Sequence, residues 1–277
     1  MLAVGKSGFN WQYSLDVNPS TTPGVSVTPG SGSEGAYVQL ASGANLTQDV
    51  YGILLWFNAG NTTTGIRDIL ADIGVDQAGG TSYDQTHGIS DIFVPQASNA
   101  VEGGRWFWFP LFIKAGSSVG VRGMASSAST FRCMAVFYGQ PTRPENCPVG
   151  IYSETIGVSG NGGYPFTCAN SGGVGGWTSI GTTTRALWYW QLAFGHNVGT
   201  TTAQMYFVSL GFGDGTVANT ITIIRNMPQF NPGTAEKSGN PLFTGIWEVP
   251  AGSTLYVRGS ASGTAETTEA VAIGIGG

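Results

Sequence analysis

The feature that most constrains this fold is an internal repeat with a period of 136 to 137 residues. Four pairs of identical residues share this separation in the same order along the chain: Phe57 and Phe194, Gly74 and Gly211, Gly116 and Gly252, and Arg122 and Arg258. The last two pairs lie in segments that read Ala-Gly-Ser-Ser-Val-Gly-Val-Arg-Gly and Ala-Gly-Ser-Thr-Leu-Tyr-Val-Arg-Gly. Self-similarity at a fixed separation is typical of a duplicated structural unit. We therefore expect two homologous units in tandem.

Each unit is expected to be all-β. Short runs rich in Val, Ile, Thr and aromatic residues, such as 36–40, 50–57, 131–138 and 220–225, are separated by Gly, Asn, Asp and Pro, and no window shows a sustained helical period. Many short strands at even spacing favour a jelly-roll-like antiparallel sandwich. An immunoglobulin-like sandwich is disfavoured, because the Cys–Trp–Cys spacing is absent and such domains have about 100 residues.

The repeat also predicts where the units begin and end. Residues 1–140 are expected to form the first jelly-roll-like sandwich and residues 150–277 the second. Between them, residues 141–149 contain three prolines, which suits a short, stiff linker.

Composition narrows the range of partners. Glycine accounts for 44 of the 277 residues, only 10% are charged, and the net charge is −5. Duplex binding depends on Lys and Arg neutralising phosphates, so nucleic acid is not an expected partner. Apolar runs such as 106–113 are far shorter than the ~20 residues of a membrane-spanning helix, so no membrane span is expected. The N-terminus shows no signal-peptide pattern.

The sequence shows no motif for catalysis or metal binding. His87 and His196 lie in different units, and no Gly-x-Ser-x-Gly nucleophile elbow is present. The three cysteines, Cys133, Cys147 and Cys168, form no CxxC pair and are expected to be free thiols in or near the core. We therefore expect a chain that is not an enzyme, with no catalytic residues, no metal site and no cofactor.

Two aromatic runs are candidate contact surfaces. Alternation along a strand places Trp106 and Trp108 on one face, and the same pattern predicts that Trp188 and Trp190 share a face. One face of each strand must be core. The other is expected to be an interface between subunits or a platform on which sugar rings stack.

The repeated strand itself looks structural. Gly116 and Gly252 are expected to form its entry turn, while Arg122 and Arg258 are expected to point outward and to pair with an acid or stack on an aromatic ring.

The same segment resembles a module of structural proteins in tailed bacteriophages, in which an Ile-Pro-Ala-Gly-Ser turn leads into a Val-x-Arg strand and a Ser/Ala-rich loop. The likeness covers about 30 residues per unit, with Lys114 in place of the usual Pro in the first unit. It implies a virion component, made in the host cytoplasm, of the head decoration, cement or tail type, and it implies no catalytic residue.

Two functional hypotheses follow. The first is a non-enzymatic virion protein, a head decoration or cement protein, that forms homo-oligomers and binds other capsid or tail proteins. Its few charges favour this reading, since a charge in an interface must be desolvated. The second is a glycan- or receptor-binding module of a tail fibre or adhesion apparatus, with a surface glycan as its partner.

Overall fold

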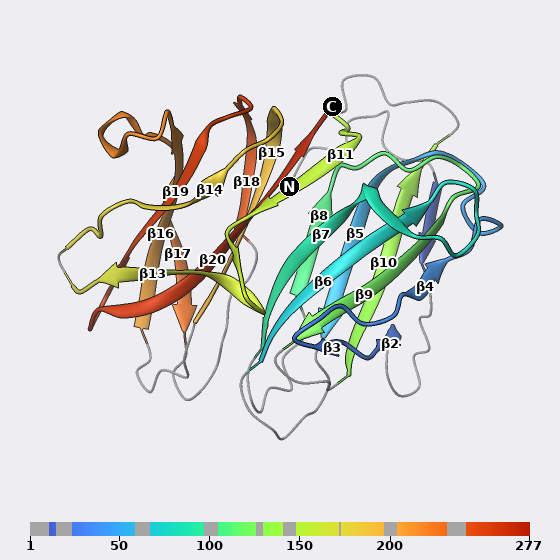
Figure 1. Cartoon of the computed structure of the whole chain (residues 1–277), viewed down its shortest axis with the longest axis horizontal. Coiled ribbons are helices and arrows are strands. Elements are labelled where there is room, and N and C mark those ends of the chain that lie inside the picture. The colour runs from blue at the N-terminus through green and yellow to red at the C-terminus, as the bar shows by residue number, and fades with distance from the viewer. Residues whose placement is uncertain are drawn as a thin grey trace.

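The computed structural model describes the following residues: 11–14, 24–58, 67–96, 105–125, 130–140, 148–171, 173–196, 204–231 and 242–277. Within them, strands predominate and the helix η1 (Val217–Asn219) is a single 3₁₀ turn. The prediction of an all-β chain made of two tandem sandwiches is confirmed, with the first repeat drawn from blue to green and the second from yellow to red (Figure 1).

The first repeat consists of two sheets that face each other. One, which we call the β5 sheet, contains β1 (Trp11–Ser14), β2 (Val25–Val27), β5 (Val50–Asn58), β8 (Arg105–Phe109) and β10 (Phe131–Gly139). The other, the β6 sheet, contains β3 (Gly30–Ser31), β4 (Val38–Ala41), β6 (Arg67–Asp76), β7 (Asp84–Gln96) and β9 (Ser118–Ala125).

The second repeat has the same plan. Its β15 sheet contains β11 (Tyr152–Ile156), β12 (Val158–Ser159), β13 (Gly162–Ala169), β15 (Leu187–His196), β18 (Leu242–Val249) and β20 (Glu266–Gly276). Its β16 sheet contains β14 (Thr178–Thr182), β16 (Gln204–Gly213), β17 (Ile221–Asn231) and β19 (Thr254–Ala261). Strand β13 pairs with both β20 and β19, which joins the two sheets into one ten-stranded sheet.

The main strand pairings of the two repeats correspond. The orders β2-β10-β5-β8 and β4-β9-β6-β7 in the first recur as β13-β20-β15-β18 and β14-β19-β16-β17 in the second. Since the chain crosses between the sheets at nearly every connection, this is the topology of a jelly roll. The boundaries 1–140, 141–149 and 150–277 stay predictions, since residues 141–147 lie outside the described residues.

The Gly116 and Gly252 turns correspond as well. Both glycines have a left-handed φ, +80° and +81°, at the third position of a four-residue turn closed by a hydrogen bond from Ser117 N to Lys114 O or from Ser253 N to Pro250 O. A β-carbon on either glycine would meet nothing within 4 Å. The backbone conformation, and not a lack of space, is therefore what requires glycine at these two positions.

A contact between the repeats buries the outer face of the β15 sheet, the face turned away from the core of its own sandwich. Tyr189, Ala193, Val271, Ile273 and Ile275 all belong to the hydrophobic core of the first repeat, although their strands belong to the second. Their neighbours along the same strands, such as Trp190, Leu192 and Ala272, point into the core of the second repeat.

The edge of the first repeat that receives this face is formed by β7 and β8, beside β11 in Figure 1. Trp108 O accepts hydrogen bonds from Tyr189 Oη and from Gln191 Nε2, both at 2.6 Å. The carbonyl oxygens of β7 accept from hydroxyl groups on β11: Ser153 Oγ donates to Gly88 O at 2.8 Å, and Thr155 Oγ1 donates to Ser90 O. The contact therefore buries apolar surface and also satisfies backbone acceptors of an edge strand.

Both described cysteines are buried and free, Cys133 in the core of the first repeat and Cys168 in that of the second. Burial raises the pKa of both thiols, that of Cys168 to about 11. Cys147 lies outside the described residues.

A substitution at the contact between the repeats tests how much this contact contributes to the free energy of unfolding. Ile273→Ala should lower the free energy of unfolding by about 2–4 kcal/mol, because it removes buried methyl groups from a packed core. Chemical denaturation measures this change. Val174→Ala, at an exposed loop position, is the control and should shift the value by less than about 0.5 kcal/mol. An equally small effect of Ile273→Ala would contradict the packing described.

Candidate functional site

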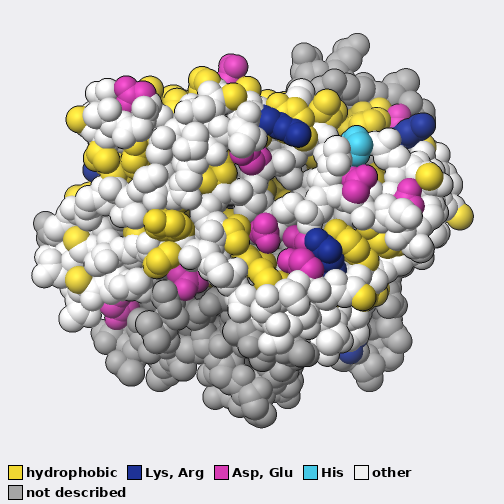
Figure 2. Space-filling view, viewed as in Figure 1, with side chains coloured by type: hydrophobic (Ala, Val, Ile, Leu, Met, Phe, Trp, Pro, Cys, Tyr) yellow, Lys and Arg dark blue, Asp and Glu magenta, His cyan; other side chains and the backbone are white. Residues whose placement is uncertain are grey.

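The outer face of the β6 sheet carries a cluster of charged residues around a buried ion pair. Asp72 on β6 lies directly opposite Arg122 on β9 in the antiparallel register. Arg122 Nε donates to Asp72 Oδ2 at 2.9 Å and lies 3.5 Å from Glu34 Oε2. The guanidinium also lies over the ring of Tyr37, 4.7 Å from its centroid. Acidic and basic side chains meet near the centre of this face in Figure 2.

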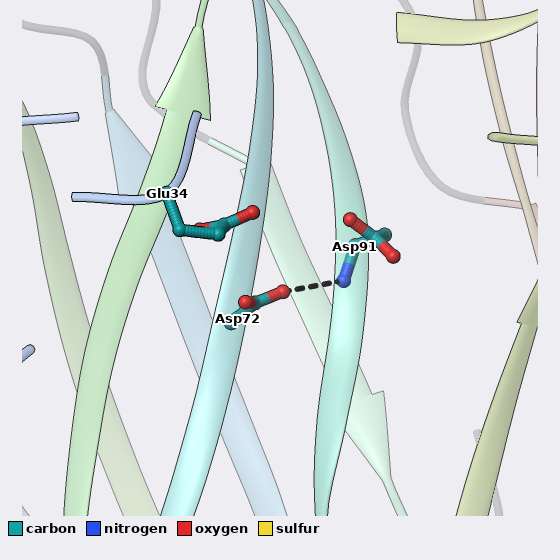
Figure 3. Close-up of side chains that lie close together, drawn as sticks. All are labelled: Glu34, Asp72 and Asp91. Atoms are coloured by element: carbon teal, nitrogen blue, oxygen red, sulfur yellow. Dashed lines mark hydrogen bonds between the residues drawn. The ribbon is translucent and has the colours of Figure 1, made fainter. Parts of the chain in front are cut away.

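Asp91 completes the cluster through an irregularity in β7. Its φ of +52° is in the left-handed region, and it falls where the pairing between β6 and β7 shifts register. Its backbone N–H donates to Asp72 Oδ1 at 2.8 Å (Figure 3). Each oxygen of the buried Asp72 carboxylate therefore has a donor.

The three carboxyl groups are crowded, and their pKa values reflect it. One oxygen from each lies within 4.8 Å of the other two, and Figure 3 shows the three side chains together. Burial, followed by the charge of Asp72, raises the pKa of Glu34 to about 7 and that of Asp91 to about 6. Carboxyl oxygens this close are potential cation ligands, but the position between Asp72 and Glu34 already holds the Arg122 guanidinium. The ion pair with Arg122 thus compensates one carboxylate, and crowding with burial favours the protonated forms of the other two.

The second repeat carries the same arrangement without carboxyl groups. Ser209 stands opposite Arg258, Asn226 has a φ of +49°, and Asn226 N donates to Ser209 Oγ at 3.0 Å. Arg258 lies 4.3 Å from the centroid of the Trp177 ring, as Arg122 does over Tyr37. The stacked arginine and the hydrogen-bonded irregularity therefore recur in both repeats, whereas among the described residues the carboxyl cluster occurs in the first repeat alone.

Other acidic residues bind their own loops. Asp76 accepts from Ala78 N and Ser82 N, and the exposed Asp214 accepts from Thr216 N and Asn219 Nδ2. The side chain of Asp68 lies outside the described residues.

A second candidate site is the outer face of the β5 sheet, which we call the outer aromatic face. It consists of residues on β5, β8 and β10 that point away from the sandwich core: Leu54, Trp56, Trp106, Trp108, Met134, Val136 and Tyr138. Trp106 is 46% exposed, while Phe107 and Phe109, on the other side of β8, are buried. The rings of Trp56 and Trp106 lie 6.4 Å apart, and Trp108 meets Tyr138 edge to face at 5.3 Å.

The prediction that Trp188 and Trp190 share a face is wrong. Leu187 and Trp190 lie in the core of the second repeat, whereas Trp188 and Tyr189 contact the core of the first, so strict alternation along β15 is lost between Trp188 and Tyr189. Trp190 is fully buried in the core of the second repeat, where its Nε1 donates to Trp247 O at 3.1 Å. Trp188 instead packs, partly buried, against the core of the first repeat. Trp190 therefore offers no surface to a subunit or a sugar.

Sequence reasoning missed Glu34, Tyr37 and Asp91. No motif marks them, because they come from three separate segments that only the sandwich brings together. One signal in the sequence could have found the site. When the two repeats are aligned, Asp72 falls at the position of Ser209. A charged residue at a buried position where the other repeat has a neutral one indicates a specialised site.

No protein-family model and no curated protein matches the chain. Among solved structures it is similar to PNGase F, a glycosylasparaginase from Flavobacterium meningosepticum, with 10% identity, a TM-score of 0.40 and 96% of each chain covered. It is also similar to the major capsid protein P2 from bacteriophage PM2, with 10% identity, a TM-score of 0.31, and 96% and 98% covered. A third similar structure is the CBM22 tandem domain from Paenibacillus barcinonensis Xyn10C, with 11% identity and a TM-score of 0.26. The match covers 96% of this chain and 91% of that one.

These comparisons correct one expectation. The prediction that the chain is not an enzyme is contradicted, since the similar solved structures include an enzyme, PNGase F. A viral capsid protein and a CBM22 tandem domain are among these structures too. At these identities and TM-scores, no activity, ligand or partner passes to this chain. Within the described residues, no helix has the length and apolar character to span a membrane.

The two repeats provide a matched test of the buried ion pair. Arg122→Met should lower the free energy of unfolding by about 3–5 kcal/mol, because it leaves the buried Asp72 carboxylate without its cation. Arg258→Met should cost only about 1 kcal/mol, because its neighbour is the neutral Ser209 and the loss is mainly the stacking on Trp177. Denaturant titration of both variants measures the two losses in the free energy of unfolding. Equal losses would contradict the stated role of the buried Asp72 carboxylate.

The raised pKa of Glu34 predicts a pH dependence of stability. A folded-state pKa of about 7, above the ordinary value of 4.5, means that the stabilising proton is fully bound below pH 4.5 and lost as pH rises through 7. The free energy of unfolding should fall over this window, and Glu34→Gln should reduce the fall by about 1–2 kcal/mol after allowance for solvent contact. Glu248→Gln, at an exposed position, is the control and should leave the profile unchanged.

Proposed function

We propose that this chain is a structural component of a bacteriophage particle, a head decoration or cement protein that associates with itself and with neighbouring capsid subunits. The observation that carries the proposal is the outer aromatic face. It places three tryptophans on adjacent strands of one sheet: Trp56 is buried, Trp108 is partly buried, and Trp106 is 46% exposed. Exposed apolar patches of this kind mark interaction sites, and interface cores are enriched in aromatic residues.

The low charge of the chain supports the same function. With 27 charged residues in 277, the surface has few groups that an assembly would have to desolvate. The resemblance of the repeated turn and strand to phage structural proteins provides the particular context, a virion rather than another assembly.

The second candidate, a glycan- or receptor-binding module, is favoured by one observation. Trp106 is 46% exposed and lies beside the buried Trp56, and an exposed indole ring suits stacking against a sugar ring. Trp188 and Trp190 no longer support it, because Trp190 is buried.

Particle association distinguishes the two candidates. In particles purified on a density gradient from a virus whose genome encodes the chain, mass spectrometry should detect the protein, and immunogold labelling should place it on the heads. Recombinant protein should bind particles that lack it, and Trp106→Ser should weaken this binding at least tenfold, the equivalent of ~1.4 kcal/mol. Absence from particles, together with wild-type binding to a glycan array that Trp106→Ser abolishes, would overturn the structural function in favour of the glycan.

A further inference from the structure

The second repeat keeps the stacked arginine of the charged cluster but has neutral residues where its acids stand. Arg258 on β19 occupies the position of Arg122, and its guanidinium lies 4.3 Å from the centroid of the Trp177 ring. Within the described residues, Arg258 forms no ion pair, and its buried Nε has no hydrogen-bond acceptor. The same atom of Arg122 donates to Asp72. The second repeat therefore holds a half-buried positive charge without the compensation that the first repeat provides.

At the position of Glu34, the second repeat has a valine. The glycine that follows Glu34 and the glycine that follows Val174 each donate a backbone hydrogen bond to the residue after the stacked arginine, at 2.9 and 3.0 Å. Val174 therefore corresponds to Glu34, whose Oε2 lies 3.5 Å from Arg122 Nε. Val174 is 63% exposed. The side of the guanidinium that meets a carboxyl group in the first repeat is thus bordered in the second by a short apolar side chain.

The other two acidic positions carry hydrogen-bonding groups without charge. Ser209 corresponds to Asp72, since each lies opposite its arginine in the strand register. Asn226 corresponds to Asp91, since both have a positive φ and donate a backbone hydrogen bond to that serine or aspartate. Ser209 Oγ lies 3.3 Å from Asn226 Oδ1, which leaves Nδ2 of the exposed Asn226 as a donor.

The surroundings of this arginine combine positive charge with apolar surface. Arg225, which is exposed, precedes Asn226 in the same irregularity of β17 and adds a second cation. Phe207 is 37% exposed and lies two residues before Ser209 on the outer face of β16, while the residue between them is buried in the core. An inorganic anion would use only the charge, whereas an organic carboxylate would also cover the apolar surface of Phe207 and Val174.

We propose that Arg258 and Asn226 bind the carboxylate group of a small organic ligand, at the place that the Glu34 carboxyl group takes in the first repeat. The guanidinium stays stacked on Trp177 and donates to the carboxylate, and the Asn226 amide donates as well. A planar guanidinium matches a carboxylate, and hydrogen bonds between charged groups are the stronger ones. The site lies on the outer face of the β16 sheet, in the other repeat from the outer aromatic face, so it does not depend on the proposed function.

Benzoate is the probe, because it joins a carboxylate to an apolar ring, and benzamide is its neutral counterpart. In proton–nitrogen correlation spectra of the full chain, benzoate should shift the Arg258 Nε–Hε resonance and saturate at millimolar concentration. The spectrum of Arg258→Lys, which lacks this resonance, assigns it. Benzamide should leave it in place. The Arg122 resonance is the internal control and should not move with benzoate, because Asp72 already accepts from this guanidinium.

Two substitutions fill the site from within the chain. Val174→Glu supplies the carboxyl group that Glu34 has in the first repeat, and Ser209→Asp supplies that of Asp72. Each should weaken benzoate binding by at least about tenfold, because the new carboxylate competes for Arg258. Val174→Gln is the matched neutral control and should change the Kd by less than about twofold.

Circular dichroism and thermal melting show whether each variant is folded. Position 174 is exposed and position 209 is buried, so Val174→Glu carries the test if Ser209→Asp does not fold.

Three results would overturn the proposal: no shift of the Arg258 resonance with benzoate, an equal shift with benzamide, or undiminished benzoate binding in Val174→Glu. Inorganic phosphate that binds as tightly as benzoate would also overturn it, because the apolar surface would then contribute nothing. None of these results bears on particle association, which tests the proposed function separately.

Discussion

The structure depends on burying both faces of the β15 sheet. Strand β20 alternates between residues that point into its own sandwich, such as Ala272, and residues that point to the first repeat, such as Ile273, and both sets are fully buried. A sheet that is apolar on both faces has to be covered on both. The β7–β8 edge of the first repeat supplies the second cover, and in return its exposed carbonyls gain donors from Ser153 and Thr155. The two sandwiches therefore share part of one hydrophobic core and are not independent domains joined only by a linker.

Duplication lets one repeat act as a control for the other. Both repeats keep the left-handed glycine turn, the arginine stacked on an aromatic ring and the residue of positive φ in β7 or β17. Features kept in both serve the jelly roll. Features present in one, the Glu34, Asp72 and Asp91 carboxyl groups and the outer aromatic face, are where the repeats have diverged. The divergence is also physical, because burial and the charge of Asp72 raise the pKa values of Glu34 and Asp91, and because Trp106 leaves apolar surface in water.

The sequence predicted the outline of the fold well and the sites only in part. Strand signals and the repeat led to two sandwiches, because a period of two and a duplicated turn are local properties that tertiary contacts do not override. The prediction that Trp188 and Trp190 share a face failed, because the alternation along β15 breaks between Trp188 and Tyr189, and no motif in the residues marks that break. The exclusion of an enzyme failed for a related reason: a missing motif says little when side chains from distant segments, such as Glu34 and Asp91, form the cluster.

By itself the sequence determined the class of the protein: an all-β chain, duplicated, poor in charge, with glycine where the Gly116 and Gly252 turns need a positive φ. These properties follow from local sterics and from side-chain chemistry. Only the tertiary structure decided which apolar faces are covered and which remain open. The corresponding faces of the two repeats both carry apolar residues, yet one is sealed by the other repeat and the other keeps Trp106 exposed. Whether a side chain is buried depends on what packs against it. The arrangement of the two repeats in space decides this, and the sequence of the strand that carries the side chain does not.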